Sequence, residues 1–216
     1  MTVHELLPPI RKPVAEWPQQ GHNRWHPDLP PALEVEPGDE VVVDCRDGLD
    51  GLVTPTTTDA DLLGLELSRA HPMTGPIAVR GARPGDVLRV EILSIDCDDF
   101  GATEVIPGFG LLAAEFPDPF LVTWGLRDGA ATSGRMPGIR VPADPFLGVI
   151  GVAPSQERLQ AFAAREAEIA GRGGVAMPPE PGGAVPAAAS RRRRARRSPP
   201  RAPRRPAGAP ARERRR

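Results

Sequence analysis

The hydrophobic positions of this chain fall in short runs bounded by proline and glycine. Apolar, often β-branched residues in these runs predict strands at 35–45, 77–79, 87–95, 120–126 and 138–141. The 87–95 run is the clearest of them, because only three polar residues interrupt it. Short strands joined by long Pro/Gly-rich loops predict a mainly β fold, with sheets arranged as in a sandwich or barrel.

Two turn-and-strand units repeat at an offset of 47 positions. Pro37-Gly38-Asp39 precedes the apolar stretch 40–44, and Pro84-Gly85-Asp86 precedes 87–91. Two interpretations remain open. Either an ancestral unit was duplicated, or any sharp turn into a strand selects these residue types.

One helix is predicted, at 155–170. Its larger side chains recur at spacings of three and four, Ser155 can cap its first turn, and three nearby glycines, at 171, 173 and 174, end it. No apolar run reaches the roughly 18 residues of a membrane span, and the first residues lack a signal peptide's apolar core. We therefore expect a cytoplasmic protein, in which Cys45 and Cys97 are reduced, buried thiols rather than a disulfide or metal pair.

The charge is distributed unevenly. The whole chain carries −1, but residues 191–216 contain 13 arginines and one glutamate, which leaves −13 for residues 1–190. From 182 onward nearly every residue is Ala, Gly, Pro, Ser or Arg, a composition that predicts disorder. The tail at 188–216 is either a nucleic-acid-binding segment or the product of a reading-frame slip in a GC-rich gene.

Several polar side chains are candidates for chemistry. His71 stands before a Pro-Met-Thr-Gly turn that would constrain its ring, although a packed or surface histidine would look the same. Asp47 and Asp50 follow the first long strand and could act as a base or bind a divalent cation, or simply form a turn.

His22 and His26, with Asp28, could bind a metal ion or substrate in a folded loop, or belong to a surface loop anchored by Trp25. The chain lacks a Gly-x-Ser-x-Gly motif and a phosphate-binding Gly-rich loop. Lys12 is its only lysine, which disfavours serine–lysine amidase chemistry.

Five segments in this order resemble the acetamidase/formamidase family of amide hydrolases. They are 22–31 (HNRWHPDLPP), 71–77 (HPMTGPI), 81–86 (GARPGD), 107–112 (PGFGLL) and 145–155 (PFLGVIGVAPS). The resemblance implies hydrolysis of a linear amide such as formamide or acetamide to a carboxylate and ammonia. It also implies a divalent cation, Zn²⁺ or Ca²⁺, and a homo-oligomer in intact members.

Family members continue into a second half that this resemblance does not reach. We therefore expect residues 1–187 to be the N-terminal part of such a domain, 188–216 to be an out-of-frame tail, and the product to be truncated and impaired. The metal ligand set would then be incomplete. The alternative function is a non-enzymatic protein that binds polyanions or nucleic acid through its arginine-rich tail.

Overall fold

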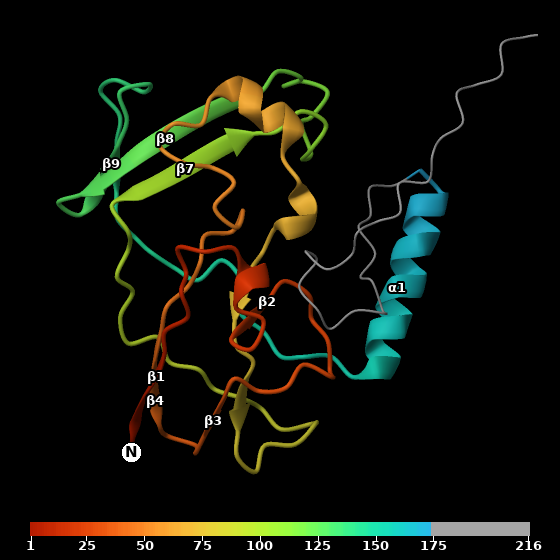
Figure 1. Ribbon diagram of the computed structural model, residues 1–216. Coiled ribbons are helices and arrows are strands. Elements are labelled where there is room, and N and C mark those ends of the chain that lie inside the picture. The colour runs from red at the N-terminus through yellow and green to blue at the C-terminus, as the bar shows by residue number, and fades with distance from the viewer. Residues whose placement is uncertain (174–216) are drawn as a thin grey trace, which may run out of the picture.

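The structure, a computed structural model, describes residues 1–173, so the predicted tail at 188–216 lies outside the described residues. Its strands form four small sheets (Figure 1). The largest is antiparallel, in the order β10-β9-β8-β7, with bounds Arg140–Pro142, Ala130–Thr132, Phe120–Arg127 and Phe100–Val105. The predicted mainly β class is confirmed.

The other three sheets are strand pairs. β1 (Val3–Leu6) runs parallel to β4 (Glu40–Val43), and β3 (Leu33–Val35) runs parallel to β6 (Ile77–Val79). β2 (Gly21–His22) is antiparallel to β5 (Met73–Thr74). Three short 3₁₀ helices connect them, η1 (Val14–Glu16), η2 (Asp59–Gly64) and η3 (Leu67–Arg69). Because these pairs join segments far apart in the sequence, they bring loops together at their ends.

The main core lies between the four-stranded sheet and η2. Leu62 from η2 is buried against Val53 and Leu121, and Phe100 and Ala102 of β7 pack around them. η2 is fixed to β8 by Asp59, whose carboxylate accepts a hydrogen bond from the Leu121 amide at 2.8 Å. β7 therefore turns its Phe100 and Ala102 face toward the loop that joins β4 to η2.

The predicted helix is present as α1 (Gln156–Gly171), and Ser155 caps it by accepting a hydrogen bond from the Arg158 amide at 3.2 Å. Its Leu159 is buried, whereas Phe162 is exposed. No helix within residues 1–173 is long and apolar enough to cross a membrane.

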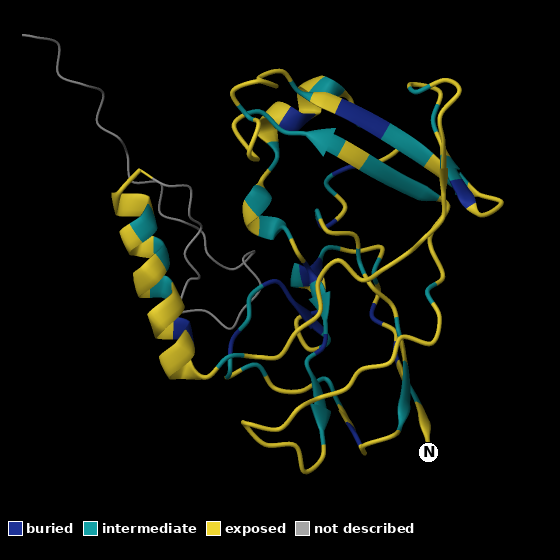
Figure 2. Cartoon of the chain, turned by 180° about the vertical axis from the view of Figure 1, so that it is seen from behind, coloured by how far each residue is buried: buried dark blue, intermediate teal, exposed yellow. Residues whose placement is uncertain are grey.

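Two predictions are wrong, one about a strand and one about burial. The stretch 87–95 belongs to no strand, and its Val87, Leu88, Val90, Ile92 and Leu93 are exposed (Figure 2). The local pattern was that of a strand, but no other described segment pairs with it. Cys45 and Cys97 are free thiols on exposed residues rather than buried ones, and Cys97 lies at the end of this unpaired stretch.

Candidate functional site

Three loops that are distant in the sequence meet beside β2 (Figure 1). The 46–51 turn follows β4, and the His71 amide donates a hydrogen bond to the carbonyl oxygen of Gly48 in that turn at 2.7 Å. The 22–28 loop is tied to η3, because the side chains of Asn23 and Arg24 both donate to the Ser68 carbonyl at 2.9 Å. We call the 46–51 turn, the 22–28 loop and the segment between η3 and β5 that carries His71, together with Glu104 of β7, the candidate site.

Asp50 is the most constrained residue of the candidate site. It is 2 % exposed and holds a left-handed backbone conformation, with φ 57°. Its carboxylate accepts hydrogen bonds from the Val14 amide at 3.0 Å, from Arg69 at 2.8 and 2.9 Å, and from Arg46. Two guanidinium groups and one backbone amide therefore surround it, and together they join the N-terminal segment, the 46–51 turn and η3.

This environment keeps Asp50 ionised. Burial by itself would raise its pKa, but the hydrogen bonds from Val14, Arg69 and Arg46 outweigh burial and lower the pKa. A carboxylate whose oxygens are already bonded to two arginines is a poor proton acceptor for a substrate. The geometry therefore favours a positioning role for Asp50, in which it fixes the turn that carries Asp47.

Asp47 and Glu104 are a pair of carboxyl groups with different surroundings. Asp47 is exposed, and its two oxygens accept hydrogen bonds from the amides of Leu49 and Gly51 at 2.9 and 2.5 Å. Glu104 is half-buried on the face of β7 that also carries Phe100 and Ala102. Burial, and then the negative charge of Asp47, raise the pKa of Glu104, against the opposing effect of its own backbone amide.

His71 is exposed, and its backbone is left-handed, with φ 58°. Its amide is held by Gly48, and two residues later Met73 enters β5 and pairs with His22. Non-glycine residues in this conformation are uncommon and are concentrated at functional positions. The fold thus brings His71, the Asp47 turn and His22 into one region.

His22 is 5 % exposed and lies edge-on to Trp25, with ring centroids 6.1 Å apart. Burial lowers its pKa, against the opposing effect of the Arg24 backbone, so the ring is neutral at pH 7. Its Nδ1 atom is buried and has no hydrogen-bond partner among the described residues. A buried ring nitrogen without a partner is uncommon and indicates a group that a ligand or a further segment could satisfy.

His26 and Asp28 interact locally. His26 is also buried, and its Nδ1 accepts a hydrogen bond from the Asp28 amide at 3.1 Å, while the Asp28 carboxylate is largely exposed. Within residues 1–173 no three His, Cys, Asp or Glu side chains are placed to hold a metal ion together. The described residues therefore do not fit a cation site by themselves.

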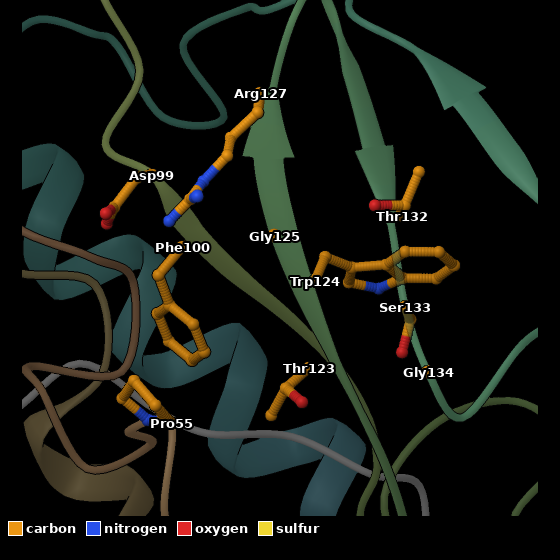
Figure 3. A pocket seen from close by; sticks show the side chains of 10 residues that line it. All are labelled: Pro55, Asp99, Phe100, Thr123, Trp124, Gly125, Arg127, Thr132, Ser133 and Gly134. Atoms are coloured by element: carbon orange, nitrogen blue, oxygen red, sulfur yellow. The ribbon is translucent and has the colours of Figure 1, made fainter.

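A shallow pocket of about 370 Å³ lies elsewhere, at the open end of the β7–β8 hairpin (Figure 3). Figure 3 shows the Arg127 side chain extending toward Asp99, with Phe100 beside them and Trp124 next to Ser133. None of the residues predicted to carry chemistry lines this pocket. It therefore does not alter the choice of candidate site.

Sequence analysis missed Glu104, Arg46 and Arg69. None of the predicted strands covers Glu104, whereas it follows Phe100 and Ala102 at alternate positions of β7. That alternation places an acidic residue on an inward face, which is the signal that could have found it. Arg69 had no such local signal, because its partner Asp50 lies 19 residues away in the sequence. Arg46 is only four residues from Asp50, but their ion pair depends on the turn between them, which the sequence pattern did not specify.

Comparison with known proteins assigns residues 9–209 to the model of the Acetamidase/Formamidase family. The chain is 35% identical over 159 residues to an acetamidase of Mycolicibacterium smegmatis, covering 68% of this chain and 39% of that protein. It is 35% identical over 161 residues to a formamidase of Methylophilus methylotrophus, covering 71% and 40%. The chain therefore spans about two fifths of the length of these curated relatives.

Solved structures of two other proteins are also similar to this chain. A γ-lactamase from Delftia acidovorans superimposes with a TM-score of 0.75 and 31% identity, over 82% of this chain and 46% of that one. An acetamidase from Bacillus halodurans superimposes with a TM-score of 0.58 and 25% identity, over 71% and 46%. The described fold thus corresponds to less than half of each of these relatives.

Proposed function

This chain belongs to the acetamidase/formamidase family, and on that premise we propose that it supplies one side of a site that hydrolyses the carbon–nitrogen bond of a linear amide. Formamide and acetamide are the substrates proposed, because the curated relatives are a formamidase and an acetamidase. The reaction adds water to the amide carbonyl and yields a carboxylate and ammonia.

The observation that carries the proposal is the pairing of Asp47 with Glu104. Amide hydrolysis needs a group that takes a proton from the attacking water, because neutral water is a weak nucleophile toward a resonance-stabilised carbonyl. Glu104 suits this role, since burial and the Asp47 charge raise its pKa and make it a stronger base than an ordinary carboxylate. Asp47 acts through Glu104 and is held in place by the amides of Leu49 and Gly51.

His71 is proposed as the group that returns a proton to the departing nitrogen, because an imidazole can donate and accept protons near neutral pH. Its backbone bond to Gly48 ties it to the turn that carries Asp47. The unpartnered Nδ1 of His22 is proposed as a contact for the substrate amide. His26 and Asp28 are proposed to shape the loop that presents His22, and Asp50 to hold the 46–51 turn.

A divalent cation, which the family resemblance implies, would need ligands beyond residues 1–173, and no step above depends on one. We also propose that the 216-residue chain alone hydrolyses amides poorly, since the relatives are far longer than the part it matches. Groups that act as a unit lose orders of magnitude in rate when members are missing.

The experiment that tests this function compares ammonia release from formamide and acetamide by two purified proteins. One is the chain alone, and the other is the chain joined to the part of the Mycolicibacterium smegmatis acetamidase outside the matched segment. We expect turnover by the joined protein and little by the chain alone. An inactive joined protein, beside an active acetamidase in the same assay, would count against the proposal.

A further inference from the structure

Two stretches in the described part of the chain belong to no helix or strand and are almost entirely exposed. They are 87–97, which leads into β7, and 144–154, which leads into α1. No backbone amide or carbonyl of either stretch bonds to another residue in the described part of the chain. Together they carry ten exposed large apolar side chains: Val87, Leu88, Val90, Ile92, Leu93, Phe146, Leu147, Val149, Ile150 and Val152.

The pattern of these side chains is that of a strand covered on both faces. In 87–95 apolar residues stand at even positions (88, 90 and 92) and at odd positions (87, 93 and 95), so in a strand they would project to both sides of the backbone. Such runs are typical of strands inside a sheet, whose two faces are both buried. Contiguous apolar surface with unpaired backbone marks a binding surface for another polypeptide.

The internal repeat provides a comparison within the chain. In the first unit, Glu40–Val43 follows Pro37-Gly38-Asp39 and pairs with β1 residue by residue. In the second unit, 87–91 follows Pro84-Gly85-Asp86 with a similar apolar pattern, and it has no partner among the described residues. The second unit therefore has the sequence pattern of a paired strand but no partner strand among the described residues.

We propose that 87–97 and 144–154 form a docking surface for the remaining part of the family fold, and that this part binds even when it is supplied as a separate polypeptide. The argument for this occupant is that more than half of the matched relative has no counterpart in the described fold. The described fold superimposes on the Delftia acidovorans γ-lactamase with a TM-score of 0.75, yet it corresponds to only 46% of that chain. The occupant adds strands by backbone hydrogen bonding and covers the apolar side chains.

The docking surface adjoins the candidate site. Gly151 lies against the Trp25 ring, so closely that an added Cβ would come within 3.0 Å of it. Trp25 in turn lies edge-on to His22, whose Nδ1 has no partner among the described residues. A polypeptide seated on 144–154 would therefore border the loop that holds His22. This inference concerns binding alone and does not depend on catalysis.

The test mixes the purified 216-residue chain with a fragment of the Delftia acidovorans γ-lactamase that comprises the part outside the superposition. Light scattering after size exclusion should show a one-to-one complex. Ile92→Asp and Val149→Asp should each weaken binding at least tenfold, because each would place a charge in the covered face. Both side chains are about half exposed in the free chain, so circular dichroism and melting should stay as in the parent.

Leu63→Asp is the matched control. Leu63 is 68% exposed and lies on η2, outside both stretches, so this variant should bind like the parent. Binding that survives both Ile92→Asp and Val149→Asp would overturn the proposal. So would self-association of the chain without uptake of the fragment, since a second copy would then be the occupant.

A second test joins the chain and the fragment in one polypeptide, which removes the entropic cost of associating two separate chains. In a single polypeptide that joins this chain to the same fragment, hydrogen exchange at amides 87–97 and 144–154 should slow at least tenfold relative to the 216-residue chain. Amides 40–43, which already pair in β4, are the internal reference and should change little. Exchange at 87–97 that stays as fast as in the free chain overturns the proposal, whatever the mixing experiment shows.

Discussion

The amide nitrogen of His71 lies 2.7 Å from the carbonyl oxygen of Gly48, to which it donates a hydrogen bond. This bond joins two segments that sequence analysis had selected separately, the Asp47–Asp50 turn and the histidine before β5. Because the bond uses backbone atoms, it leaves the His71 imidazole available for chemistry. The candidate site therefore depends on a backbone contact, and Asp50 with its two arginines holds the same 46–51 turn.

Replacing Asp50 by Asn should strongly destabilise the fold. The substitution keeps the shape but leaves Arg46 and Arg69 without their shared negative charge, and breaking a buried ion pair in this way costs about 3–5 kcal/mol. Urea or thermal unfolding measures the change. Asp28→Asn, at a largely exposed carboxylate, is the control and should shift the unfolding free energy by less than about 0.5 kcal/mol.

The contribution of Asp50 should also depend on pH, with a definite sign. Its folded-state pKa is lowered, so the stabilisation is present above the unfolded-state pKa of about 3.9 and is lost as the pH falls through the folded-state value. The difference in unfolding free energy between the parent and Asp50→Asn should therefore be constant from pH 7 to 5 and should shrink below pH 4. A difference that grows in acid would contradict the arrangement around Asp50.

Replacing Gly51 by Ala should destabilise the 46–51 turn. Gly51 has φ +73°, and an added Cβ would collide with the Arg46 guanidinium that bonds to Asp50. We expect a loss of about 1–3 kcal/mol in unfolding free energy, from backbone strain and the displaced arginine. Gly48→Ala is the matched control, since a Cβ there would meet nothing within 4 Å. Equal effects of the two substitutions would count against this account of the turn.

Replacing Asp47 by Asn should lower the pKa of Glu104. Burial is the larger cause of the raised value and remains in the variant, while the repulsion from the Asp47 charge is removed. Titration of the Glu104 carboxyl carbon by NMR in the 216-residue chain measures this without any need for activity. Asp28→Asn should leave the Glu104 titration as it is in the parent. An unchanged Glu104 pKa in the Asp47 variant would show that the two carboxylates do not interact.

The elements that were predicted well are those whose signals are local. Ser155 and the spacing of apolar residues predicted α1, and the apolar run at 120–126 predicted β8, because a cap or a strand propensity is contained in a few adjacent residues. The stretch 87–95 has an equally strong local pattern, yet it forms no strand among the described residues. A strand also requires a partner, and partners are set by contacts distant in the sequence.

The candidate site was predictable only in part, for the same reason. His22, His71 and Asp47 were selected because their residue types suit the chemistry, and the fold brings their loops together. The carboxylate of Asp50 looks equally reactive in the sequence, but Arg69, 19 residues away, and Arg46 occupy its oxygens. Glu104 shows the opposite case. Its burial and the nearby charge of Asp47 arise only when β7 and the 46–51 turn both pack around the core of Val53, Leu62 and Leu121.

Glu104→Gln tests the central claim most directly, in the chain joined to the unmatched part of the Mycolicibacterium smegmatis acetamidase. Ammonia release from acetamide is measured for the parent and the variant at the same protein concentration, after circular dichroism has shown equal folding. The account predicts that the variant loses about 100-fold or more in kcat, because Gln cannot accept a proton from the attacking water. A variant that releases ammonia at the parent's rate would contradict the assignment of Glu104 as the base.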